Sequence, residues 1–263
     1  MVIDSLRVPS FARDFIQDIK HITDKKIKFV IDTHAHWDHA WGNEEFPDAI
    51  IIGHENCYNE MTDIEWNKQW REKIVNSGDS WSEEAKLVQI TPPNQTFAKT
   101  MRLYFGGREI ILRYLGKAHT SGDIFIHLPE SNILFSGDVA QNEGMPFFGD
   151  SYPEEWPETD DKLINLTVDT FVAGHGPIGN HDDLVNARDF LHKFIKEIKN
   201  LKKLSTTSER KVLKLWEGLG YYRRARNLIL SLIHISEPTR RSAISYAVFC
   251  LKKKRGGGGG GGG

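Results

Sequence analysis

Short apolar segments that each lead to a histidine or an aspartate are the feature that most constrains this sequence. Residues 27–31 are apolar except for Lys28 and mostly β-branched, and they run into His34. Two later apolar segments run into Asp138 and His175. Apolar runs of this length between turn residues predict buried strands. Loops at strand ends are where an α/β protein places its functional side chains. The sequence therefore predicts an α/β fold with a polar site at the strand ends.

The remaining pattern alternates strands with helices, as expected for this fold class. Apolar residues at helical spacing, among them Phe11, Phe15 and Ile19, follow Pro9, a residue that favours a helix start. Gly106-Gly107 between two alternating segments predicts a hairpin turn. We predict strands at 2–4, 27–31, 49–52, 97–105, 108–115, 123–128, 132–135 and 170–173, and helices at 9–22, 55–76 and 181 to about 203.

Four potential metal ligands lie within six residues shortly after the strand at 27–31, in the segment His34-Ala35-His36-Trp37-Asp38-His39. In an extended turn, His34 and His36 point the same way and can reach one cation, while Asp38 and His39 can reach a second. Imidazole and carboxylate without thiolate suit zinc and other first-row metals in a catalytic site. A histidine-rich surface turn is the alternative, and the density of ligands after a buried strand disfavours it.

Three more candidate ligands follow at other strand ends. His119 lies in the loop 116–123, Asp138 follows Gly137, and His175 lies between two glycines. Each has a simpler explanation when taken alone, as a residue of a turn or of a helix start. Together they supply ligands from separate strand ends, which a solvated loop would not do.

These motifs resemble those of the metallo-β-lactamase superfamily: HxHxDH, the histidine of a GxxHTxGD-like loop, the aspartate of LFxGD and the histidine of GHG. The resemblance covers roughly residues 1–200. It implies an αββα sandwich with the site at one edge of the two sheets. Members usually have several strands before the strand at 2–4, so we expect a sandwich that is incomplete at its N-terminus.

The resemblance also implies a metal-binding role for each matching residue. His34, His36 and His119 would hold one divalent cation, Asp38, His39 and His175 would hold the other, and Asp138 would bridge them. Zinc is the expected metal, with iron or manganese as alternatives. Asp38 is the candidate catalytic residue, which orients the nucleophile and passes on its proton. Asp4 and Asp123 either hold ligand histidines in the correct tautomer or only form turns.

The expected function is a binuclear metal-dependent hydrolase in which a metal-bound hydroxide attacks an ester, thioester, lactone or amide carbonyl of a small molecule. His36 argues against the diiron oxidoreductase branch of the superfamily, where the resemblance would place glutamate. Residues 1–189 hold 17 Lys and Arg against 32 Asp and Glu, a net charge of −15. That charge disfavours nucleic acid and a phosphodiesterase activity, the alternative within the same superfamily.

The end of the chain is basic, unlike the rest, because residues 190–263 hold 17 Lys and Arg against 4 Asp and Glu. Residues 208–228 resemble a helical segment of A/G-specific adenine glycosylases, so a DNA-binding or repair protein is the second hypothesis. We expect three parts: a metallo-β-lactamase-like domain at 1–200, a glycosylase-like helical fragment at 201–230, and an unstructured tail at 231–263 ending in eight glycines.

Neither a signal peptide nor a long apolar run is visible, which predicts a cytoplasmic protein without membrane contact.

Overall fold

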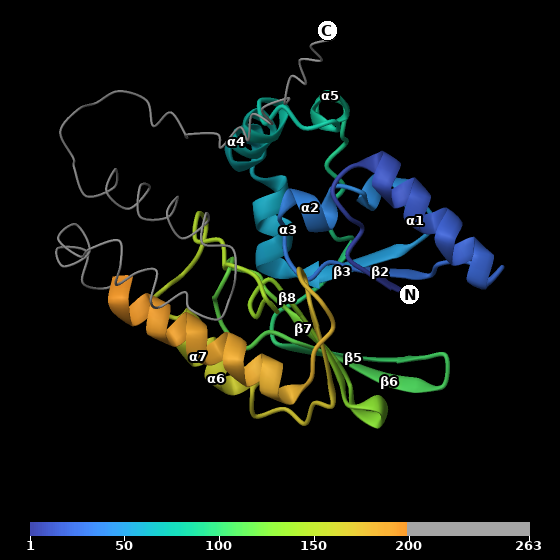
Figure 1. The fold of residues 1–263 in the computed structure, drawn as a ribbon. Helices are drawn as coiled ribbons and strands as arrows, with labels where there is room; N and C mark the ends of the chain where they lie inside the picture. The colour runs from blue at the N-terminus through green and yellow to red at the C-terminus, as the bar shows by residue number, and fades with distance from the viewer. Residues whose placement is uncertain (199–263) are drawn as a thin grey trace, which may run out of the picture.

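Two β-sheets form the centre of the computed structural model, which describes residues 1–198 (Figure 1). The glycosylase-like segment and the glycine run lie outside the described residues. The first sheet is parallel throughout, in the order β1 (Val2–Ile3), β2 (Phe29–Ile31), β3 (Ile50–His54) and β4 (Gln95–Phe97). The second sheet has the order β5 (Thr100–Phe105), β6 (Arg108–Arg113), β7 (Phe125–Leu128), β8 (Ile133–Gly137) and β9 (Thr170–Ala173). Its strands are antiparallel except for the parallel pair β8 and β9.

The two sheets pack face to face through alternate residues of their strands. In β2, Ile31 faces the second sheet while Val30 faces outwards, and the same alternation places Ile52 inwards and Ile51 outwards in β3. This period of two is the geometry of any pleated strand. The buried layer between the sheets is formed by Ile31, Ile52, Ile110, Leu112, Ile124 and Ile126.

Helices cover the outer faces of both sheets (Figure 1). Helix α1 (Pro9–Ile22) packs Ala12 against Val30 and Ile51 of the first sheet. Helices α6 (Trp156–Leu163) and α7 (His181–Ile198) pack on the second sheet, where Trp156 and Leu184 meet Phe171. The expected αββα sandwich is therefore confirmed for the described residues. None of their helices combines the length and the apolar character needed to cross a membrane.

Two predicted elements differ from the structure. The helix expected at 55–76 is two helices, α3 (Glu55–Thr62) and α4 (Ile64–Val75), because Asp63 adopts an extended backbone and its side chain accepts a hydrogen bond from the Trp66 N–H at 2.9 Å. The hairpin strand expected at 97–105 begins at Thr100, because residues 95–97 pair with β3 in the other sheet.

Several short elements carried no detectable period in the sequence. They are α2 (Trp37–Ala40), η1 (Asn43–Glu45), α5 (Ser82–Ala85), η2 (Pro129–Ser131) and the two-turn helix α6. Helix α2 matters for the site because it begins within the histidine-rich segment and turns Asp38 and His39 away from a continued strand. A helix of one turn is too short for apolar periodicity to reveal.

Replacing Asp63 with alanine removes the cap of α4, and we expect a loss of about 1 kcal/mol in the free energy of unfolding. Urea denaturation of the two proteins measures it. Asp24→Ala, an exposed aspartate outside any helix, is the matched control and should change little. Equal stability of the Asp63 and Asp24 variants would contradict the capping role.

Candidate metal centre

All seven candidate ligands meet at one edge of the sandwich, although they come from four separate segments of the chain. They are supplied by the loop after β2 (His34 and His36), helix α2 (Asp38 and His39), the loop between β6 and β7 (His119), the end of β8 (Asp138) and the end of β9 (His175). Both sheets contribute, so the cluster exists only when the sheets are packed together.

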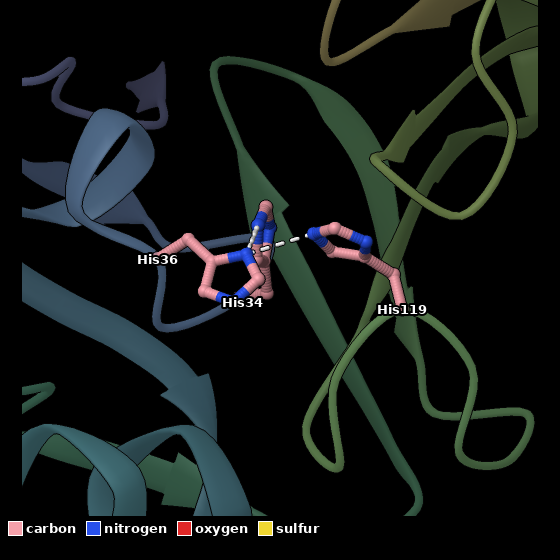
Figure 2. A group of neighbouring side chains, drawn as sticks. All are labelled: His34, His36 and His119. Atoms are coloured by element: carbon pink, nitrogen blue, oxygen red, sulfur yellow. Dashed lines mark hydrogen bonds between the residues drawn. The ribbon is translucent and has the colours of Figure 1, made fainter. Parts of the chain in front are cut away.

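His34, His36 and His119 form the first group of potential ligands (Figure 2). The His36 Nδ1 atom lies 3.1 Å from His34 Nε2 and 2.8 Å from His119 Nε2. Figure 2 shows His119 reaching from the loop of the second sheet toward the two histidines of the first. All three side chains are buried, so this group is shielded from water.

Asp38, His39 and His175 form the second group. The His175 Nε2 atom lies 3.2 Å from both His39 Nε2 and Asp38 Oδ2. Asp138 lies between the groups, with its carboxylate oxygens 3.3 Å from His39 Nε2 and 3.6 Å from His119 Nε2. The side chain of His175 is 43% exposed, whereas those of His39 and Asp138 are buried. Solvent therefore reaches the cluster from the side of His175.

Asp4 holds the candidate ligand His39 in place, which is one of the two roles that the sequence suggested for this aspartate. Its Oδ2 atom lies 2.7 Å from His39 Nδ1, and its two oxygens accept hydrogen bonds from the Thr33 N–H and hydroxyl at 2.7 and 2.9 Å. A carboxylate on Nδ1 directs the other ring nitrogen of His39 into the cluster. Asp123 instead accepts from the N–H and hydroxyl of Thr120 and shapes the loop that carries His119. For Asp123, the turn-forming interpretation is correct.

Asp150 was not singled out by the sequence, yet it contacts His36. Its Oδ2 atom lies 3.2 Å from His36 Nε2 and accepts a hydrogen bond from the Trp70 indole at 2.9 Å. The same loop provides the Phe147 carbonyl, 3.2 Å from His119 Nδ1. Asp150 follows a glycine in a segment without periodicity, 114 residues from its partner. No local signal could have identified it.

Two imidazoles of the first group, those of His34 and His119, are neutral. Burial lowers the pKa of His34 well below its usual value, and the neighbouring His39 and His36 lower it further. Burial also lowers the pKa of His119 to about 3, with the proximity of His36 as the next cause. A neutral imidazole has a lone pair ready for a cation, so His34 and His119 need no proton release before they bind metal.

The second group is charged. Hydrogen bonds to Asp138 and Asp38 raise the pKa of His175 to about 9. Burial opposes a charge on His39, but the adjacent carboxylates, Asp138 foremost, outweigh it and raise its pKa well above the usual value. Burial would likewise raise the pKa of Asp38, yet His39 and His175 lower it to about 2. A cation bound by Asp38, His39 and His175 would therefore displace the protons that these side chains hold between them.

The donor set fits divalent first-row metals. It consists of five imidazoles and two carboxylates without thiolate, with the ligand atoms of each group within 4.8 Å of one another. Gly174 leaves the space that this arrangement needs, since a Cβ atom there would collide with the Asp138 carboxylate. The protein is thus a four-layer sandwich with a candidate metal centre at one edge.

Comparison with known proteins assigns the family. The family model of the metallo-beta-lactamase superfamily matches residues 1–175. A type 2 metallo-beta-lactamase of Bacillus cereus is 23% identical over 196 residues, which are 73% of this chain and 68% of that protein. The corresponding enzyme of Elizabethkingia meningoseptica is 22% identical over 201 residues, which are 74% of this chain and 71% of that protein. The solved structure of a metallo-beta-lactamase from Pontibacter korlensis shares the fold, with a TM-score of 0.57, 21% identity, and coverage of 73% of this chain and 81% of that one.

The chain belongs to the metallo-beta-lactamase superfamily, and it is a hydrolase of that superfamily. The family expected from the motifs is thus confirmed for the larger part of the chain. The glycosylase-like resemblance at 208–228 lies outside both the matched and the described residues.

Asp150→Ala should weaken zinc binding about 10- to 100-fold, because the variant removes the carboxylate that orients His36. Competition for zinc against a chromophoric chelator measures the affinity. Asp48→Ala removes an exposed carboxylate elsewhere and serves as the control. If both variants held zinc as tightly as the original protein, Asp150 would have no positioning role.

Proposed function

We propose that this chain is a binuclear metal-dependent hydrolase. The observation that carries the proposal is the position of Asp138, whose carboxylate contacts His119 in the first group of potential ligands and His39 and His175 in the second. A single carboxylate between two such groups could bridge two cations, one held by each group. Zinc is the metal best matched by this donor set, with iron or manganese as alternatives.

Two divalent cations would supply the activation of water and the polarisation of the substrate carbonyl. Side chains of the protein would transfer the protons and exclude bulk water. Asp38 contacts His175 at the more exposed side of the cluster, where it can accept a proton from the nucleophile and deliver it to the leaving group. The buried histidines of the first group would keep bulk water out, which strengthens electrostatic interactions within the site.

The substrate we propose is a small molecule with an ester, thioester, lactone or amide carbonyl. The named relatives are metallo-beta-lactamases, which supports attack on a carbonyl group. The net charge of −15 over residues 1–189 opposes the approach of a phosphodiester backbone. A DNA-repair function finds no support in the family match, which ends at residue 175.

His36→Ala and Asp138→Ala should each abolish hydrolysis and reduce bound metal, because each removes a proposed ligand. Elemental analysis and a screen of ester, thioester, lactone and lactam substrates measure the two effects. His21→Ala, an exposed histidine at the end of α1, is the control and should alter neither. Full metal content and activity in His36→Ala would refute the assignment of the site.

Metal content should depend on pH in two stages. A cation in the second group must displace the proton of His175, whose pKa is about 9, so its affinity should fall as the pH decreases below that value. The first group should retain its cation to lower pH, because the pKa of His119 is about 3. Dialysis against limiting zinc at pH 6 and pH 8.5, followed by elemental analysis, tests the difference. Parallel loss of both cations would contradict it.

A further inference from the structure

A cavity of about 260 Å³ adjoins the exposed side of the candidate metal centre. Asp38, His39 and His175 line it at the metal centre, and apolar side chains such as Phe135 and Val172 line it between the sheets. Its volume lies slightly below the roughly 300–1,000 Å³ of pockets for drug-sized ligands, so it suits a short carbon chain. A substrate whose carbonyl lies at the metal centre can extend into this cavity.

Arg7 brings a positive charge to the same cavity. Its guanidinium carbon lies 5.0 Å from the centre of the Phe11 ring and 4.8 Å from the centre of the Trp81 ring, so two aromatic side chains hold it. Within residues 1–198, Arg7 forms no ion pair, whereas Arg13 on the following helix pairs with Glu45. The N–H groups of the Arg7 guanidinium can therefore donate hydrogen bonds to an anion.

The turn that carries Arg7 is strained and firmly attached to the metal centre. Asp4 and Leu6 have positive φ angles of 57° and 69°, a conformation that costs energy for residues other than glycine. The Ser5 N–H donates to the His39 carbonyl at 2.6 Å, and the Gly42 N–H donates to the Leu6 carbonyl at 3.1 Å. These bonds fix the turn against α2, and with it the position of Arg7 relative to the candidate ligands.

We propose that Arg7 determines specificity by binding a carboxylate that the substrate carries a few carbon atoms from the carbonyl under attack. This proposal rests on the proposed hydrolase function. One guanidinium matches one carboxylate through two parallel hydrogen bonds, and the apolar wall suits the methylene groups between the two ends of the substrate. The acidic body of the protein disfavours ligands with several negative charges.

A matched pair of chromogenic esters tests the specificity of the zinc-loaded protein. The 4-nitrophenyl monoester of glutaric acid carries the carboxylate, and 4-nitrophenyl valerate carries a methyl group in its place. We expect kcat/KM to favour the glutarate ester about tenfold to a hundredfold, the usual range for one charge-assisted contact. Arg7→Gln should reduce the ratio of the two kcat/KM values to about one, and Arg7→Lys should retain part of the preference.

Lys20→Gln removes one positive charge from the exposed face of α1 and is the matched control for long-range electrostatics. It should leave the preference intact. No preference in the original protein, or an undiminished preference in Arg7→Gln, would overturn the proposal.

Binding to the zinc-free protein separates this proposal from the hydrolase assignment. Monomethyl glutarate should shift the indole N–H signal of Trp81, next to Arg7, in the NMR spectrum of the original protein but not of Arg7→Gln. If neither ester is hydrolysed but the Trp81 signal still shifts in the original protein alone, the proposed ester hydrolysis is refuted and carboxylate binding by Arg7 is supported. If monomethyl glutarate binds equally to both proteins or to neither, the role of Arg7 is refuted, whatever the hydrolysis result.

Discussion

The buried carboxylate of Asp138, surrounded by histidines from both sheets, is the interaction on which the site depends. A lone ionised carboxylate in such a position would be strongly disfavoured, because burial costs a charge several kcal/mol. His39 and His175 compensate that cost, and together they hold the pKa of Asp138 well below its usual value despite burial. The cluster can therefore form only where the ends of β2, β8 and β9 meet.

The sandwich provides this meeting point through its apolar middle layer. Ile31 and Ile52 of the first sheet pack against Leu112 and Ile126 of the second. This packing fixes the two sheets relative to each other, so that the loops at their strand ends meet at one shared edge. The polar loops need not stabilise the fold themselves. At roughly 25 cal/mol per Å² of buried apolar surface, the layers of the core can offset the cost of gathering so many polar groups.

The site is asymmetric in charge and in exposure. The first group is buried, and the pKa values of His34 and His119 are lowered there. In the second group the pKa values of His39 and His175 are raised, that of Asp38 is lowered, and solvent reaches His175. The cavity that reaches Arg7 opens on this second group. The proton transfer proposed for Asp38 and the substrate recognition proposed for Arg7 thus lie on one side of the candidate metal centre, and its buried histidines lie on the other.

The sequence alone predicted every strand except β4 and singled out the seven candidate ligands, because strand periodicity and the spacing in the His34–His39 segment are local properties. Local signals could not reveal that residues 95–97 join the other sheet, since strand pairing depends on distant partners. Nor could they reveal Asp150, which reaches His36 through a loop without periodicity, or Arg7, whose neighbours become a cavity only when β1, α1 and β8 pack together. Contacts between distant segments are set by how the sheets and helices pack, and for that reason only the tertiary structure decided them.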